Sequence, residues 1–439
     1  MTHGSRVVKV GTLARVEGEG GMEVVVDADG TVTDVRLDIF EPPRFFEALL
    51  RGRSWDEPVD ITSRICGICP VAYQLSASQA LEQAMGLAVP DELRLLRRLL
   101  YCGEWIESHA LHIYLLHAPD FLGYPGGLEM AADHREAVER GLSLKRVGND
   151  LMAAIGGRSV HPVNVRVGGF HRLPDPAALR RLRPQLERAL DDAVETVRWV
   201  AGFDLPEFTQ NQTYVSLVHP DDYPMERGTV ATTEGEEMTV ATFGDRAVET
   251  HVAHSHALHA HLDGSRDYVV GPLARYALNA QRLSPVAREL AAEVGLAAPC
   301  RNPFRSIVVR AVELLHAIDE ALRLLDAWEG APVAHVDVRI PLTDAPAVGH
   351  GATEAPRGIL YHRYRLDSEG HILEATIVPP TSQNLASMED DLRRFVQPRL
   401  DLDLETLTQQ CETAVRNYDP CISCATHFLR LDVVDGRTP

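Results

Sequence analysis

Two pairs of cysteines carry the clearest chemical signal in the chain, Cys66 with Cys69 and Cys421 with Cys424. Each pair has the spacing C-x-x-C, which lets both sulfurs face one point, as metal sites and dithiol centres require. A proline stands beside each pair and restricts the backbone around the thiols. Because the pairs lie at opposite ends of the chain, they predict one four-thiolate site that closes the core between them.

The separation of the two pairs argues against two common kinds of cysteine site. A structural zinc site usually has its cysteine pairs within a few tens of residues, whereas nearly the whole chain lies between these two. A thioredoxin-like redox dithiol needs only one pair, beside a βαβ unit. Thiolates suit nickel, iron clusters and zinc alike, so the spacing indicates metal binding but no particular metal.

Composition indicates a large soluble protein. The 439 residues are 45% hydrophobic, enough for an extensive core. A net charge of −20 argues against binding to nucleic acid or to an anionic membrane, since either needs a basic face. No run approaches the roughly 18 apolar residues of a membrane span, and no secretory signal opens the chain. Seven cysteines do not make a disulfide scaffold, so we expect a reducing, cytoplasmic location.

The pattern of apolar residues divides the chain into three zones. Residues 1–60 are β-rich, residues 61–330 are mostly helical, and residues 331–439 are mixed. Since no repeat, low-complexity tract or clear linker separates them, we expect a single domain over 1–439. The predicted fold class is α+β and predominantly helical, with a central helical bundle and small flanking β-sheets.

Local signals place individual elements within these zones. Two hairpins are predicted around turns rich in Asp and Gly, one with strands 23–26 and 31–40 and one with strands 362–366 and 371–379. The other expected elements are a strand at 335–340 and helices at 93–117, at 285–294 after the N-cap Ser284, at 308–329 before Gly330, and at 404–418.

The residues around the cysteine pairs carry a resemblance to a known family. Segments 62–77 (TSRICGICPVAYQLSA) and 419–427 (DPCISCATH) together resemble the paired signature of the nickel–iron hydrogenase large, catalytic subunit. Further matching motifs are RVEGEG at 15–20, PPRFFEALLRGR at 42–53, GGRSVHP at 156–162, VGPLARYALN at 270–279, EAPRGILYH at 354–362 and VPPTSQN at 378–384. The surroundings of both pairs look most like the soluble, cytoplasmic NAD(P)-linked or sulfhydrogenase-type branch.

The resemblance implies the fold of that large subunit and reversible heterolytic cleavage of dihydrogen into protons and electrons. It implies nickel and iron at the cysteines, carbon monoxide and cyanide on the iron, and a magnesium ion. It also implies an iron–sulfur small subunit, since no group of thiols remains here for an electron-transfer chain, and flavin- and NAD(P)-binding diaphorase subunits. The alternatives are a structural four-cysteine zinc protein and a quinone-reductase-related subunit, which shares the fold but lacks both cysteine pairs.

The resemblance also assigns roles to the cysteines and to a glutamate. Cys69 and Cys424 match the ligands that bridge nickel to iron, whereas Cys66 and Cys421 match ligands of nickel only. Glu17 matches the proton-transfer glutamate, which accepts the proton that heterolysis leaves on a terminal thiolate; we expect this thiolate to be that of Cys421. An apolar setting would raise the pKa of Glu17 for this task. Without the resemblance, Glu17 would be read as a solvated turn residue.

Three further residues match the family's groups around the iron. Arg357 matches an arginine that lies over the iron and its cyanide, and Pro380 and Thr381 match residues that hydrogen-bond a cyanide. The alternative for Arg357 is a surface charge, although its segment is otherwise apolar. Tyr73 stands where many members have a histidine; a phenol can donate a hydrogen bond to a thiolate but cannot shuttle protons near pH 7.

The resemblance also implies a magnesium site and a maturation signal at the end of the sequence. Glu47 and His427 match two magnesium ligands, which fits a hard cation that prefers oxygen. After His427 the chain continues with FLRLDVVDGRTP at 428–439. In many members a nickel-dependent endopeptidase removes such an extension once the metals are in place. The alternative is a permanent strand, and the sequence favours neither.

Several histidines invite a metal-site hypothesis that the sequence does not favour. The segment 251–261 contains His251, His254, His256, His259 and His261, and a polar face that is rich in histidine is the simpler explanation. His109 and His112 lie one helical turn apart and are expected to be buried packing residues rather than ligands.

Overall fold

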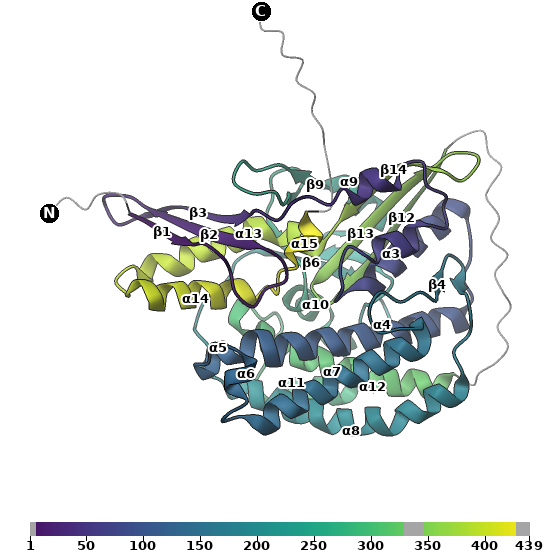
Figure 1. Ribbon diagram of the computed structural model, residues 1–439, viewed down its shortest axis with the longest axis horizontal. Coiled ribbons are helices and arrows are strands. Elements are labelled where there is room, and N and C mark those ends of the chain that lie inside the picture. Colours follow the sequence, from purple (N-terminus) through teal and green to yellow (C-terminus); the bar gives the residue numbers. More distant parts are fainter. Residues whose placement is uncertain (1–5, 329–345, 427–439) are drawn as a thin grey trace, which may run out of the picture.

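A computed structural model describes residues 6–328 and 346–426. Long helices form one layer, and small sheets with shorter helices lie on top of it (Figure 1). This arrangement confirms the predicted class, a predominantly helical α+β fold with flanking sheets. In the part of the chain that the structure describes, no helix is long and apolar enough to cross a membrane.

Four long helices make the core of the helical layer, each with one face of apolar residues buried against its neighbours. They are α4 (Asp91–Leu111), α7 (Arg135–Gly156), α8 (Pro176–Ala201) and α12 (Ser306–Ala327). The shorter helices around them are α5 (Ala118–Leu122), α6 (Gly127–Met130), α10 (Pro272–Asn279) and α11 (Pro285–Glu293). The predicted helix 93–117 is realised as α4 followed by one π-helical turn, His112–His117.

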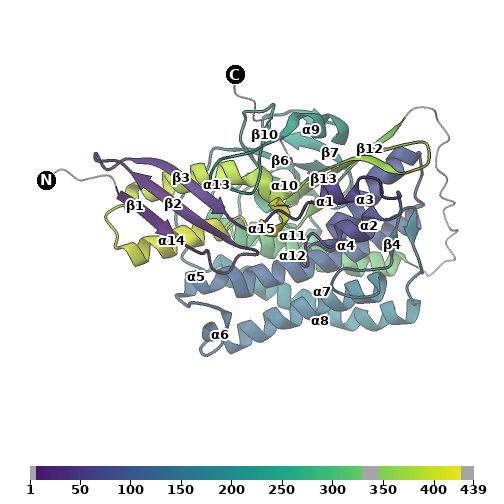
Figure 2. The same cartoon turned by 45° about the horizontal axis from the view of Figure 1, so that its top comes forward.

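Both predicted hairpins are present in three-stranded antiparallel sheets. The first sheet contains β1 (Arg6–Val10), β2 (Gly20–Val26) and β3 (Val32–Ile39), and it lies beside α13 in both views (Figures 1 and 2). The second contains β12 (Ala347–Ala355), β13 (Gly358–Leu366) and β14 (Ile372–Val378). These two sheets come from opposite ends of the chain, where the cysteine pairs also lie.

The remaining strands form small sheets at the top of the molecule and one short hairpin. The four-stranded sheet has the order β11 (Tyr268–Val269), β6 (Thr213–Val218), β7 (Thr229–Thr232), β8 (Glu237–Met238). The two-stranded sheets are β9 (Ala247–Thr250) with β10 (His259–Leu262) and β4 (Val165–Arg166) with β5 (Gly169–Phe170). The remaining helices are α1 (Phe46–Leu50), α2 (Pro58–Thr62), α3 (Pro70–Met85), α9 (Val240–Arg246), α13 (Pro380–Val396), α14 (Leu404–Arg416) and α15 (Ile422–Ala425), with 3₁₀ turns at Ala280–Arg282, Pro303–Arg305 and Gln397–Arg399.

Close contact between α3 and β12 fixes the helix that follows the first cysteine pair. A Cβ atom on Gly349 would lie 1.8 Å from the carbonyl oxygen of Ala80, and one on Gly351 would lie 2.2 Å from that of Ser76. Only glycine therefore fits at these two strand positions. The absence of side chains there lets the helix backbone lie directly on the sheet.

Helix ends account for most differences from the predicted elements. Ser284 is the N-cap of α11, but its hydroxyl makes no capping bond, and its backbone N–H donates to His316 Nδ1 at 3.1 Å. The predicted helix 404–418 ends at Arg416, because Asp419 has a left-handed φ of 52° and Pro420 cannot continue a helix. Helix α12 ends at Ala327, while Gly330, the predicted strand 335–340 and the tail strand lie outside the described residues.

Candidate metal centre

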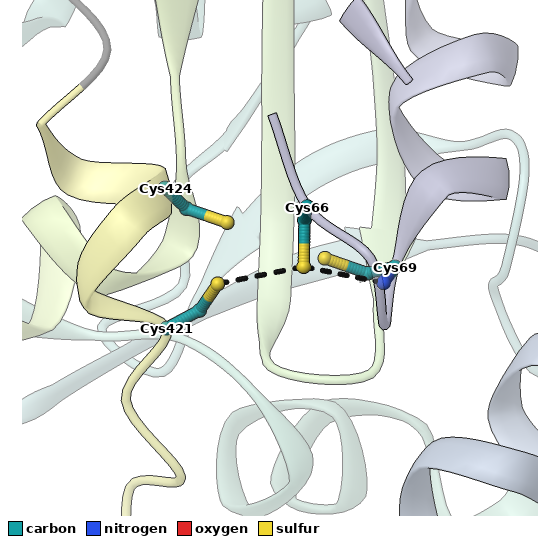
Figure 3. Close-up of side chains that lie close together, drawn as sticks. All are labelled: Cys66, Cys69, Cys421 and Cys424. Atoms are coloured by element: carbon teal, nitrogen blue, oxygen red, sulfur yellow. Dashed lines mark hydrogen bonds between the residues drawn. The ribbon is translucent and has the colours of Figure 1, made fainter. Parts of the chain in front are cut away.

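The structure brings the four cysteines of the two pairs together in the interior. Cys66 lies in the loop before α3 and Cys69 is the N-cap of α3, while Cys421 is the N-cap of α15 and Cys424 lies within it (Figure 3). The Sγ atoms of Cys66 and Cys421 are 3.5 Å apart, and all four sulfurs lie within 4.8 Å of one another. All four residues are buried. This is the closed, four-sulfur arrangement that the spacing of the pairs predicts.

The thiols influence one another's ionisation. Hydrogen bonds from Cys421 and Cys424 hold the pKa of Cys66 well below its usual value. The pKa of Cys421 is instead raised well above its usual value, and burial is the main cause. The backbone N–H groups of Ile68 and Cys69 also approach the Cys66 sulfur, at 3.4 and 3.3 Å. Four thiolates cannot share this buried space without positive charge, so the donor set fits thiophilic cations such as nickel and iron.

Arg357 supplies fixed positive charge beside the sulfurs. It lies in the turn between β12 and β13, is 3% exposed, and donates to the Asp419 backbone oxygen at 2.6 Å and to Asp419 Oδ1 at 3.1 Å. Burial by itself would lower the pKa of Arg357, but Asp419 and the cysteine thiolates raise it well above the usual value. Its Nη1 atom is buried and makes no hydrogen bond to any described residue, so one charged donor remains for a ligand.

The first turn of α13 reaches the second cysteine pair. Thr381 is buried, and its Oγ1 atom accepts a hydrogen bond from the Cys421 backbone N–H at 2.9 Å. Because this oxygen acts as an acceptor, its own O–H is a donor for another group. Pro380, at the first helical position, is buried next to it. The helix also directs the positive end of its dipole toward the sulfurs.

Glu17 lies against Cys421 through both its backbone and its side chain. The Glu17 carbonyl accepts from the Ile422 N–H at 2.9 Å, and its Oε2 atom lies 3.1 Å from both Cys421 Sγ and the Ser423 nitrogen. Burial and the charge of Cys66 raise the pKa of Glu17, against the lowering effect of these hydrogen bonds. A half-buried carboxyl with a raised pKa, in direct contact with a thiol, can exchange a proton with it.

The glycine after Glu17 is required for this contact. Gly18 has a φ of +90°, and a Cβ atom there would lie 2.7 Å from Ile422 Cβ. Any other residue would therefore be strained and would push α15 away. The motif RVEGEG thus places its first glutamate at the sulfurs and leaves Glu19 exposed.

The structure places only one of the other two predicted metal ligands. Glu47, on α1, accepts a hydrogen bond from the Ile377 N–H at 2.7 Å through Oε1, and it is not part of the sulfur group. His427 lies outside the described residues, so the magnesium pair stays a prediction. Tyr73 is buried in α3 beside His362, with ring centroids 5.6 Å apart. Burial and the charges of Cys424, Cys69 and Cys421 raise the pKa of Tyr73, so the phenol stays neutral.

A buried ionic network near the centre was missed by sequence reasoning. Arg275 donates to Glu313 at 2.7 and 2.8 Å and to Glu354 at 3.0 Å, and all three side chains are fully buried. His109, predicted to be buried, lies 3.1 Å from Glu313, and burial lowers the pKa of His109 to about 4. The available signal was the presence of Arg275 and Glu354 in two of the matching motifs, but their partnership depends on the fold.

Glu104 is a second residue that the sequence did not single out. Its carboxylate accepts from the Val71 N–H at 2.6 Å and from the Ala72 N–H at 3.2 Å, at the start of α3. It therefore caps the helix immediately after Cys69 from within another helix, α4. Burial raises the pKa of Glu104 well above the usual value.

The chain resembles hydrogenases of known sequence and structure over nearly its full length. A family model described as nickel-dependent hydrogenase matches residues 44–142 and 265–427. The alpha subunits of sulfhydrogenases 1 and 2 from Pyrococcus furiosus are 36% and 32% identical to it, each covering 97% of this chain and matched over 98% and 100% of their own lengths.

Solved structures show the same similarity in three dimensions. An NAD⁺-reducing [NiFe]-hydrogenase in the H₂-reduced state matches with a TM-score of 0.86 and 27% identity, over 96% of this chain and 99% of that one. The [NiFeSe] hydrogenase of Desulfovibrio vulgaris Hildenborough matches with a TM-score of 0.78 and 26% identity, over 97% of this chain and all of that one.

Proposed function

This chain belongs to the nickel-dependent hydrogenase family as a catalytic large subunit, and we propose that it cleaves dihydrogen at the four-cysteine site and passes the electrons to an iron–sulfur small subunit. One contact supports this proposal most directly, the 3.1 Å approach of Glu17 Oε2 to Cys421 Sγ beside the other three sulfurs. It pairs a thiol that can receive a proton with a carboxyl that can take it onward.

The four thiolates would hold the metals, with Cys69 and Cys424 bridging nickel and iron and with Cys66 and Cys421 on nickel alone. A bound nickel–iron group would supply the polarisation of dihydrogen and the acceptor for its electrons. Arg357 offers its remaining charged N–H, and Thr381 its hydroxyl, to cyanide on the iron. Pro380 shapes the same side of the site. Glu47 and His427 would hold a magnesium ion.

The role of Glu17 follows from its position and its pKa. When a proton reaches the Cys421 sulfur, the adjacent Glu17 carboxylate accepts it. Its pKa is raised above the usual value and so lies closer to neutral pH, where a group can both accept and release a proton. Arg357 stays charged throughout and favours the deprotonated thiolates. Tyr73 stays neutral, so it would offer its O–H to a thiolate rather than relay protons.

The electron route leads out of this chain. The three remaining cysteines, Cys102, Cys300 and Cys411, are buried and do not belong to the sulfur group. The similarity to an NAD⁺-reducing hydrogenase and to sulfhydrogenase subunits supports flavin- and NAD(P)-binding diaphorase partners and a cytoplasmic location. A maturation endopeptidase acting after His427 remains part of the proposal. The mass of the active subunit tests this, since an active chain that retains Pro439 excludes obligatory cleavage.

Metal analysis combined with a hydrogen assay tests the proposed function. The purified complex should contain about one nickel and one iron per large subunit, as a site with two terminal and two bridging thiolates requires. It should also reduce a viologen dye in the presence of dihydrogen. Zinc alone in the sulfur site, with no dye reduction, would show that the structural-zinc alternative is correct.

A further inference from the structure

A second group of metal-binding side chains lies at the junction of β10, α13 and β3. His254 Nε2 is 2.8 Å from Glu389 Oε1, and His259 Nδ1 is 4.0 Å from Glu389 Oε2. One ligand atom from each of the three residues lies within 4.8 Å of the others. The two histidines belong to the histidine-rich segment, for which a polar face is the simpler sequence-based explanation. The structure instead turns them toward Glu389, which follows His254 by 135 residues.

The spacing of these atoms fits a tetrahedral ion. Bonds of about 2.0–2.1 Å to zinc place neighbouring ligand atoms about 3.3 Å apart. The two observed separations, 2.8 and 4.0 Å, bracket that value, so small side-chain rotations bring all three ligands to one ion. The His254, His259 and Glu389 side chains are 24%, 4% and 16% exposed, so the group is closed on the His259 side and open to water on the other.

The surroundings prepare the three side chains as ligands. The Leu37 N–H of β3 donates to Glu389 Oε1 at 2.8 Å and orients the carboxylate, as outer-shell hydrogen bonds do at metal sites. Burial, with the neighbouring histidines, lowers the pKa of His259 to about 4, so its imidazole is neutral and has a lone pair to donate. The buried His259 Nε2 makes no hydrogen bond to any described residue.

We propose that His254, His259 and Glu389 bind a divalent transition-metal ion of the zinc type, with water as the fourth ligand. Two imidazoles and one carboxylate form a ligand set that zinc favours. The ion would join the segment before β10 to the middle of α13. Since Glu389 lies nine residues after Pro380, the ion would be about 13 Å along the helix from the end that contacts Cys421. It would therefore brace α13 without belonging to the sulfur site.

Zinc binding to the nickel- and iron-loaded complex tests this proposal. The enzyme is treated with a chelator, incubated with a small excess of Zn²⁺, desalted and analysed for zinc. Wild type should retain one more zinc per chain than Glu389→Gln or His254→Gln. Glu389→Gln replaces the carboxylate by an amide whose oxygen can still accept from the Leu37 N–H, so folding should be preserved. His261→Gln is the matched control, because His261 lies in the same segment but pairs with Asp267 at 2.7 Å.

X-ray absorption at the zinc edge separates this site from the sulfur centre. The expected spectrum shows nitrogen and oxygen ligands only, and zinc should raise the thermal midpoint of wild type but not of Glu389→Gln. Equal zinc content in wild type and both variants, or sulfur in the zinc shell, would overturn the proposal. Nickel and iron are measured on the same samples, so failure of this site is distinguishable from failure of the proposed function.

Discussion

Replacing Glu17 by glutamine isolates the proton-transfer step from the rest of the site. The amide keeps the size of the side chain, and its oxygen can still accept from the Ser423 N–H. It cannot take a proton from the Cys421 sulfur, which now lies 3.1 Å from the carboxyl oxygen. The loss of charge weakens the hydrogen bonds that Oε2 accepts from Cys421 and Ser423, which costs about 1–2 kcal/mol of folding free energy. Folding and metal binding should therefore survive the change.

The expected kinetic loss is much larger than the loss of stability. General acid–base groups typically contribute about 10²–10⁴-fold, which corresponds to about 3–5 kcal/mol in the barrier. The Glu17 carboxyl contacts the Cys421 thiol directly, and its pKa is raised toward neutral pH. We therefore expect the turnover rate of Glu17→Gln to fall by at least the lower figure, about 100-fold.

Hydrogen-dependent reduction of a viologen dye measures the loss, with nickel and iron determined on the same preparation. Glu19→Gln is the matched control, because Glu19 lies two residues away in the same motif and is exposed. It should turn over at the wild-type rate. If Glu17→Gln carries full metal and turns over within about twofold of wild type, the carboxyl is not on the proton path.

Three further predictions address metal assembly, the second cysteine pair and the buried histidines. Cys69→Ser should lose nickel and iron, because a hydroxyl does not replace a bridging thiolate, whereas Cys300→Ser should keep both metals in elemental analysis. Thr381→Val removes the acceptor of the Cys421 N–H and should lower the free energy of unfolding by about 1–3 kcal/mol in urea titrations, while Thr381→Ser restores it. Burial lowers the pKa of His316 to about 4, so its contribution to stability is complete above pH 6.5 and is lost as the pH falls toward 4. His316→Gln should flatten the fall of the thermal midpoint between pH 7 and 4, and an unchanged slope would contradict the assignment.

Structural features that depend on residues close together in the sequence could be predicted. The turn Asp27-Ala28-Asp29-Gly30 and the turn Asp367–Gly370 each specify a hairpin through local backbone preferences, and both hairpins are present. The spacing of apolar residues likewise predicted α4 and α12, because burial of one helical face is a periodic property.

Partnerships between distant residues could not be predicted in this way. No local pattern indicates that Arg275 and Glu313 are buried, that they face each other or that Glu354 completes the network. The same holds for Glu389, whose two histidine neighbours look like part of a polar surface in the sequence. The positions of Glu17 and Arg357 were predicted only by resemblance, because neither carries a local signal.

The meeting of Cys66 with Cys421 has a consequence for the order of events in biosynthesis. These residues are 355 positions apart, so bringing them together closes a loop whose entropy cost is about 5 kcal/mol. Synthesis runs from the N-terminus, so Cys66 is made 355 residues before Cys421, and the loop cannot close until Cys421 has been made. The polypeptide can therefore bury most of its core before Cys421 and Cys424 are available. Any assembly factor would then bind a nearly folded protein in which the four-cysteine site is still open. A truncation that removes α15 should leave such a body in solution, folded but unable to retain the metals.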